Sequence, residues 1–135
     1  MIIGIGIDSI EIKRFIPWST YPKKRLARFL SIHEIEYCLK NTIKSAERFA
    51  ARFAVREAFF KAFSQATPNH TLTLMAVSRL IQVKSTNNGS PELLIDWKRL
   101  SQKTGISLNS QRTCWIAITH TNTCATAIII LESVQ

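Results

Sequence analysis

The apolar positions along the chain change their spacing several times, and each spacing predicts one kind of element. Five of the nine residues 2–10 are isoleucine, which favours a buried strand. Residues 45–66 contain neither glycine nor proline, and Phe49, Phe53 and Phe60 recur at spacings of four and seven. This spacing predicts a long helix with one buried stripe.

Shorter helices are predicted between these two elements. Residues 11–28 mix apolar with basic positions and favour two short helices, separated by a break at Tyr21-Pro22. Ser31 and Glu34 have the spacing of a capping box, in which each residue bonds the other's backbone N–H. The box predicts a helix that continues to about Lys40.

Beyond the long helix, the pattern favours strands joined by turns. The expected elements are a loop at 67–70 with a solvated His70, a strand at 75–85, a turn at Asn87-Asn88-Gly89, a strand at 91–97, a short helix at 98–103 ending at Gly105, and strands at 114–119 and 125–131 around a polar connector. Strands that follow helices and pair as hairpins predict an α+β fold with a mainly antiparallel sheet. The long central helix should pack on one face of that sheet.

Composition places the chain among ordinary globular proteins. The 135 residues suffice for one core and contain no linker or repeat, so we expect a single domain over residues 1–135. The apolar runs are too short to span a bilayer and the N-terminal segment does not resemble a signal peptide, which predicts a cytosolic protein without a membrane partner. The three cysteines have no CxxC spacing and are expected to be buried, reduced thiols.

The net charge of +9 favours an anionic partner. Nucleic acid, an acidic protein and a polyphosphate ligand all fit the charge, but no nucleic-acid-binding motif is present. Charge alone therefore leaves a basic nucleic-acid-binding module open as an alternative.

Four polar residues in apolar surroundings carry the candidate chemistry. Asp8 interrupts the isoleucine-rich strand, where an ionised carboxylate is costly unless it is paired or bound to a cation. Glu57 and Lys61 stand four residues apart on one helix face, which fits either a surface salt bridge or a metal ligand beside a phosphate contact. His120 follows a strand and could contact phosphate, take a proton, or only cap its loop.

Two carboxylates from different elements suit a hard cation such as Mg²⁺, which fills its remaining positions with water and substrate phosphate. Mn²⁺ has the same preference for oxygen ligands, and the sequence does not rank the two. Lys61 and the arginines of the same helix, Arg52 and Arg56, could then hold phosphate charge.

Five segments, taken in order, resemble the holo-[acyl-carrier-protein] synthases, a group of 4′-phosphopantetheinyl transferases. The segments read GIGIDSIEIKRF, RFLSIHEIEYC, RFAVREAFFKAF, NNGSPELLI and WIAITHTNTCATAIIILE. Each one is short, but together they cover essentially the whole chain at compatible spacing. The resemblance implies the 4′-phosphopantetheinyl transferase fold.

The resemblance also implies an activity and a set of residues. Such enzymes move 4′-phosphopantetheine from coenzyme A to a serine of apo acyl carrier protein in fatty acid biosynthesis and release adenosine 3′,5′-bisphosphate. By position, Asp8 and Glu57 would bind Mg²⁺ and would form the catalytic set with Lys61. The residues expected to contact coenzyme A are Arg52, Lys61, His120 and Thr121.

The resemblance further implies a partner and an assembly. Acyl carrier proteins are small and acidic, and Arg14, Lys24 and Arg28 match the region that the family uses for docking. Family members of this short type form trimers with sites between subunits. His120 would then reach the acidic pair of a neighbouring chain.

One segment departs from the family pattern. Residues 63–67 stand where the family has a glycine-rich turn after the Lys-Ala pair, so either the helix runs on or coenzyme A sits differently. This departure leaves open a catalytically weak scaffold that binds carrier protein. Arg56 replaces the commoner lysine, and the general base, a metal-bound water or a carboxylate, also stays open.

Overall fold

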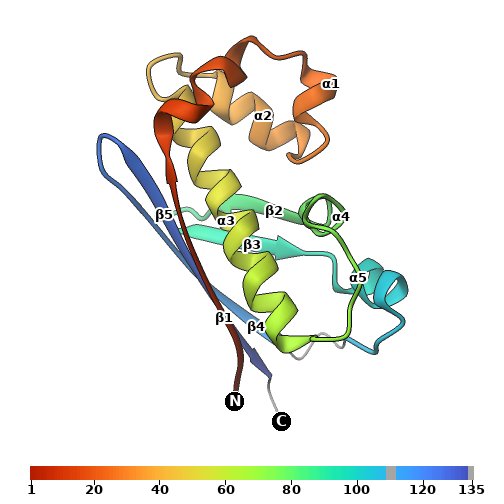
Figure 1. Cartoon of the computed structure of the whole chain (residues 1–135). Helices are drawn as coiled ribbons and strands as arrows, with labels where there is room; N and C mark the ends of the chain where they lie inside the picture. Colours follow the sequence, from red (N-terminus) through yellow and green to blue (C-terminus); the bar gives the residue numbers. More distant parts are fainter. Residues whose placement is uncertain (109–111, 134–135) are drawn as a thin grey trace.

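The computed structural model describes residues 1–108 and 112–133 (Figure 1). The elements are β1 (Ile2–Glu11), the 3₁₀ helix η1 (Ile12–Thr20), α1 (Lys23–Leu26), α2 (Ile32–Leu39), α3 (Ser45–Ala66), α4 (Leu74–Ser78), β2 (Ile81–Ser85), β3 (Pro91–Ile95), α5 (Trp97–Thr104), β4 (Arg112–His120) and β5 (Cys124–Ser133). The expected α+β class is confirmed. No helix within the described ranges combines the length and apolar character needed to cross a membrane.

The strands form two antiparallel sheets. One has the order β1-β5-β4 and the other pairs β2 with β3, so both predicted hairpins are confirmed. In Figure 1 the long helix α3 runs along one face of the three-stranded sheet. Its buried side chains include Phe49, Ala54, Phe59 and Phe63, which pack between that sheet and the shorter helices.

Two glycines let β1 lie directly on the backbone of α3. A Cβ atom at Gly4 would overlap the carbonyl oxygen of Ala62, and one at Gly6 would overlap that of Ala58. Only a residue without a side chain allows this approach. Because alternate residues of a strand share a face, Asp8 follows the two glycines on the side that faces α3.

A buried ion pair joins α2 to α3. The capping box of Ser31 and Glu34 is confirmed and starts α2. Arg56 donates to both carboxylate oxygens of Glu34, at 2.6 and 2.9 Å, and both side chains are almost wholly buried. The same two side chains also bond backbone groups at the unpaired edge of β2. Arg56 donates to Ile81 O at 3.0 Å, and the Val83 N–H donates to Glu34 at 3.3 Å.

One local prediction needs correction, whereas the two short helices on either side of Tyr21-Pro22 are confirmed. The strand predicted for 75–85 is wrong in its first half: Thr73 caps the helix α4 by accepting from Ala76 N at 3.2 Å, and β2 begins only at Ile81. Val77 and Leu80 are buried three residues apart, which is a helical spacing. The first helix after β1 is a 3₁₀ helix, and α1 is a single turn that begins after the predicted break.

His70 is not the solvated loop residue that we predicted. Its ring is half-buried near Phe63, with the ring centroids 4.9 Å apart. Its Nε2 atom bonds Ser64 Oγ at 2.8 Å, and its Nδ1 atom accepts from Leu72 N at 3.0 Å. Of the three cysteines, which are all free as predicted, only Cys38 is fully buried.

Candidate active site

The contact between β1 and α3 brings three predicted residues together. The Lys61 ammonium lies 3.3 Å from Asp8 Oδ1 and donates to Ile7 O at 2.9 Å. The Asp8 side chain is 17% exposed, whereas that of Lys61 is 52% exposed. Across the described residues, the ion-pair partner of Lys61 is therefore Asp8, and the alternative of a Glu57–Lys61 salt bridge is wrong.

Glu57 lies within the electrostatic reach of the same two groups. Partial burial raises the pKa of Glu57, the negative charge of Asp8 raises it further, and the positive charges of Lys61 and Arg14 oppose both effects. The two carboxylates thus repel each other across a half-buried site. A cation between them would relieve that repulsion.

The donor set fits a hard divalent cation. Asp8 and Glu57 supply two carboxylates, and no third His, Cys, Asp or Glu joins them in a cluster anywhere in residues 1–108 and 112–133. Mg²⁺ is bound in proteins by one or two carboxylates together with waters and substrate phosphates. A cage built wholly from protein ligands is therefore not required.

The free edge of β1 is capped by two side chains from successive turns of α3. Gln65 accepts the Ile5 N–H at 2.7 Å, and Lys61 donates to Ile7 O. Sequence reasoning missed Gln65, although its spacing of four from Lys61 placed it on the same helix face. Gln65 also lies in the segment where a glycine-rich turn was expected, and α3 runs on there to Ala66.

Arg56 is not available for phosphate. Its side chain is 1% exposed, and it donates to Glu34 as well as to the carbonyl oxygens of Phe29, at 2.7 Å, and Ser78, at 3.3 Å. The prediction that the arginines of α3 hold phosphate charge is therefore wrong for Arg56. The departure from the commoner lysine has a structural role, because the larger guanidinium reaches several carbonyl groups at once.

Arg52 borders a separate cavity of about 550 Å³ that is also lined by Tyr37 and Lys84. Its guanidinium lies over the Tyr37 ring, 4.4 Å from the centroid, and its Nε atom is 3.8 Å from Glu34 Oε2. Within the described residues, that Nε atom has no hydrogen-bond partner. The role of Arg52 as a coenzyme A contact stays a prediction.

His120 and Thr121 lie at the connection between β4 and β5. His120 Nε2 is 3.1 Å from Glu47 Oε1, in the first turn of α3. Thr121 Oγ1 accepts the Cys124 N–H at 3.1 Å and so caps the turn. Across the described residues, His120 is thus paired with Glu47 and forms no ion pair with Asp8, Glu57 or Lys61, which together we call the β1–α3 site.

The predicted docking residues are exposed on η1 and around α1. Arg14, Lys24 and Arg28 all lie at the surface, on a segment held by aromatic packing of Phe15 and Trp18 against α3. Arg14 also lowers the pKa of the nearby Glu57. The cationic surface therefore adjoins the acidic pair.

The outer face of the three-stranded sheet is apolar. Ile5, Ile7 and Trp115 are 49%, 58% and 58% exposed, and they pair with Ile130 and Ile128 of the central strand. The prediction that β1 is buried is therefore wrong for its outward-facing isoleucines in the single chain. A patch of this kind on a protein surface marks an interaction site.

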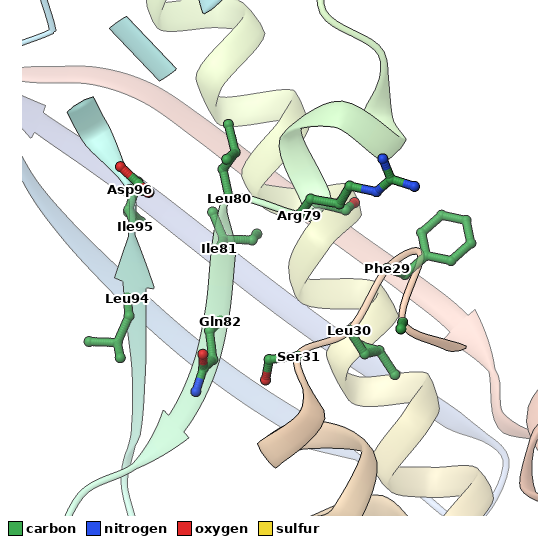
Figure 2. Close-up of a pocket in the computed structure, with 12 residues that line it drawn as sticks. Phe29, Leu30, Ser31, Arg79, Leu80, Ile81, Gln82, Leu94, Ile95 and Asp96 are labelled. Carbon is green, nitrogen blue, oxygen red and sulfur yellow. The ribbon is translucent and has the colours of Figure 1, made fainter. Parts of the chain in front are cut away.

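Another cavity lies away from these residues. Figure 2 shows residues that line a hollow between the α1–α2 connection and the β2–β3 hairpin, among them Ser31, Arg79 and Asp96. The volume of this hollow is about 420 Å³. None of the predicted site residues lines it. Polar and apolar side chains both line this hollow, and it is separate from Asp8, Glu57 and Lys61.

Comparison with known proteins identifies relatives over the full length of the chain. A sequence model of the 4′-phosphopantetheinyl transferase superfamily matches residues 4–126. The chain is 33% identical to the holo-[acyl-carrier-protein] synthase of Treponema denticola over an alignment of 135 residues, which covers 98% of the chain and 99% of that protein. It is also 44% identical, over 45 residues, to the synthase of Treponema pallidum strain Nichols, which is 33% of the chain and 35% of that protein.

Solved structures show the same architecture. A holo-(acyl-carrier-protein) synthase from Bacillus anthracis, in complex with CoA (3′,5′-ADP), is 26% identical with a TM-score of 0.71, and the match covers 99% of each chain. An ACPS–CoA complex from Chronobacterium ammoniagenes is 24% identical with a TM-score of 0.77 over 98% of each chain, and at this identity the likeness concerns the fold.

Proposed function

This chain belongs to the 4′-phosphopantetheinyl transferase superfamily, and we infer that it transfers 4′-phosphopantetheine from coenzyme A to a serine of apo acyl carrier protein in fatty acid biosynthesis. The observation that carries this inference is the meeting of Asp8, Glu57 and Lys61 where β1 packs on α3. These residues stand at the positions that the family motifs assign to the reaction. The likeness to a synthase over the full chain supports the same activity.

The transfer requires one bond to form and one to break. The serine oxygen attacks the phosphorus that carries pantetheine, and the anhydride bond to the other phosphate breaks, which releases adenosine 3′,5′-bisphosphate. The serine proton passes to a base, for which a carboxylate of the site and a water molecule are the two candidates. The Lys61 ammonium can donate to oxygens of the departing phosphate.

We propose Mg²⁺ as the resident cation, held by Asp8 and Glu57. The two repelling carboxylates and their partial burial support this assignment. When bound, Mg²⁺ would offset negative charge on the coenzyme A diphosphate. Mn²⁺ suits the same oxygen ligands and is expected to substitute for it.

We propose that the protein works as a homotrimer whose sites lie between subunits. The support comes from two features of the single chain. The outer sheet face around Ile7 and Trp115 is apolar and exposed, and His120 lies on the β4–β5 connection, where it is paired with Glu47. In an assembly covering that sheet face, His120, Thr121 and Arg52 would contact coenzyme A, with His120 supplied by the neighbouring chain.

We propose that the cationic surface of η1 and α1 receives the acidic carrier protein. Exposed Arg14, Lys24 and Arg28 and the net charge of +9 support this role. Opposite charges would steer the encounter and fix its orientation. The position of Arg14 beside Glu57 would place the carrier serine near the acidic pair.

Two broader features belong to the same proposal. We propose that residues 1–135 act as one domain, which the buried cluster shared by α3, both sheets and the shorter helices supports. We also propose a cytoplasmic location, which three free thiols support.

Release of adenosine 3′,5′-bisphosphate tests the proposed function. Wild-type protein, apo carrier protein, coenzyme A and Mg²⁺ should together release it, whereas Asp8→Asn and Glu57→Gln variants should not. A matched Lys98→Gln variant, changed at an exposed position on α5, should keep the wild-type rate. If wild-type protein binds the carrier protein without releasing the bisphosphate, the proposal of an active enzyme is wrong. The protein would then be the carrier-binding scaffold that the missing glycine-rich turn suggests.

A further inference from the structure

Lys61 contacts two oxygen atoms of β1. Its ammonium lies 2.9 Å from Ile7 O and 3.3 Å from Asp8 Oδ1. The Asp8 side chain is mostly enclosed, but half of the Lys61 side chain is exposed. Lys61 is therefore the more exposed partner of this pair, and a flexible four-carbon stem carries its charge at the rim of the site.

The Lys61 contact and a divalent cation require the same carboxylate. A cation held between Asp8 and Glu57 takes an oxygen of Asp8 as a ligand, and it repels an ammonium placed within about 4 Å. The Lys61 ammonium, 3.3 Å from Asp8 Oδ1, makes the electrostatic potential at this carboxylate more positive and so weakens the attraction of the site for a second cation. The two positive charges compete for one site.

We propose that Lys61 is a displaceable counter-ion of Asp8, an inference that rests on the proposed function. Lys61 balances the Asp8 carboxylate before a divalent cation binds. With a divalent cation bound at Asp8 and Glu57, the Lys61 ammonium would be released from Asp8 and would be free to contact the anionic diphosphate of coenzyme A. Residue Gln65, one turn further along α3, keeps its bond to Ile5 N and holds the edge of β1 in place during the exchange.

The exchange predicts effects of opposite sign on two ligands. Without the Lys61 charge, the free protein should bind a divalent cation more tightly, because nothing competes for Asp8. In the presence of the cation, coenzyme A should bind more weakly, because one phosphate contact is lost. A role limited to capping Ile7 O predicts neither effect for Lys61→Gln, since glutamine keeps an N–H donor for that carbonyl.

Titration with Mn²⁺ alone, followed by electron paramagnetic resonance, measures the first effect on the full-length protein. We expect Lys61→Gln to tighten Mn²⁺ binding by roughly 1.4-fold to fivefold, which is the range for an exposed ion pair. Lys61→Arg keeps the charge and should keep the wild-type affinity. Lys98→Gln removes an exposed charge on α5 and controls for the change in net charge. Calorimetry with coenzyme A at saturating Mn²⁺ measures the second effect.

The outcomes separate this inference from the proposed function. If Asp8→Asn abolishes Mn²⁺ binding but Lys61→Gln leaves it unchanged or weakens it, the exchange is refuted and the metal site stands. If coenzyme A affinity is the same for Lys61→Gln and wild type, the second half of the exchange is refuted. If wild-type protein and Asp8→Asn both fail to bind Mn²⁺, the metal assignment falls and the inference falls with it.

Discussion

The buried ion pair between α2 and α3 should respond strongly to the loss of one charge. Glu34 and Arg56 are each 1% exposed at the side chain and are joined by hydrogen bonds of 2.6 and 2.9 Å. Replacing Glu34 by glutamine keeps the shape of the side chain but removes its charge. The Arg56 guanidinium is then left buried without a counter-ion.

The expected size of the effect follows from this burial. Removing one partner of a buried ion pair typically costs about 3–5 kcal/mol, because the remaining charge is neither solvated nor compensated. The glutamine oxygen can still accept from Arg56, so the lower end, about 3 kcal/mol, is expected for Glu34→Gln. Against a typical stability of about 5–15 kcal/mol, this is a large fraction.

Urea unfolding followed by circular dichroism at pH 7 measures the difference. Glu36→Gln is the matched control, because Glu36 is exposed on the same helix and should change the unfolding free energy by less than about 0.5 kcal/mol. An effect of Glu34→Gln no larger than that of Glu36→Gln would refute the reasoning.

In acid, the unfolding free energy of Glu34→Gln should approach that of the wild-type protein. Burial alone would raise the pKa of Glu34, but the charge and hydrogen bonds of Arg56, with the N–H groups of Ser31 and Val83, outweigh burial and hold the pKa below its usual range. A lowered pKa in the folded state stabilises the protein above the ordinary glutamate pKa, and that contribution is lost as the pH falls through the folded-state pKa. The difference between wild type and Glu34→Gln should therefore be full at pH 7 and shrink below about pH 4.3.

Three further predictions concern the site and its assembly. Gly6→Ala should lower both the thermal unfolding midpoint and the transfer rate. The new methyl group would overlap the Ala58 carbonyl and would move β1, together with Asp8, away from α3. Thermal melts measure the first effect, and release of adenosine 3′,5′-bisphosphate measures the second. Ile7→Lys, on the apolar sheet face, should convert the proposed trimer to monomer in light scattering, and an unchanged mass would contradict that interface. Arg28→Glu should raise KM for the carrier protein while KM for coenzyme A stays constant, and equal changes in both would exclude a docking role.

The sequence predicted the elements whose signals are local. The long helix α3 was predicted with its observed bounds, because 22 residues without glycine or proline carry a regular apolar stripe. The capping box and the two hairpins also depend on residues close in sequence. The helix α4 was missed because its cap at Thr73 and its buried contacts overrode a β-like pattern.

The site was predicted less completely, because its contacts join distant parts of the chain. The motifs indicated Asp8 and Lys61, but not that these two residues, 53 positions apart, form an ion pair. Helical spacing had suggested a pair between Glu57 and Lys61 instead. Burial of Arg56 with Glu34, 22 positions away, likewise removed a predicted phosphate contact. Side-chain partners of this kind depend on tertiary packing, which residue spacing along one helix does not contain.

The mass of the carrier protein tests the central claim most directly. Apo acyl carrier protein is incubated with coenzyme A, Mg²⁺ and the wild-type protein, and its intact mass is then measured. The account predicts an increase by one phosphopantetheine group on a serine, which is absent with Asp8→Asn. An unchanged mass with wild-type protein, or an equal increase with Asp8→Asn, would contradict the assignment of transfer to the β1–α3 site.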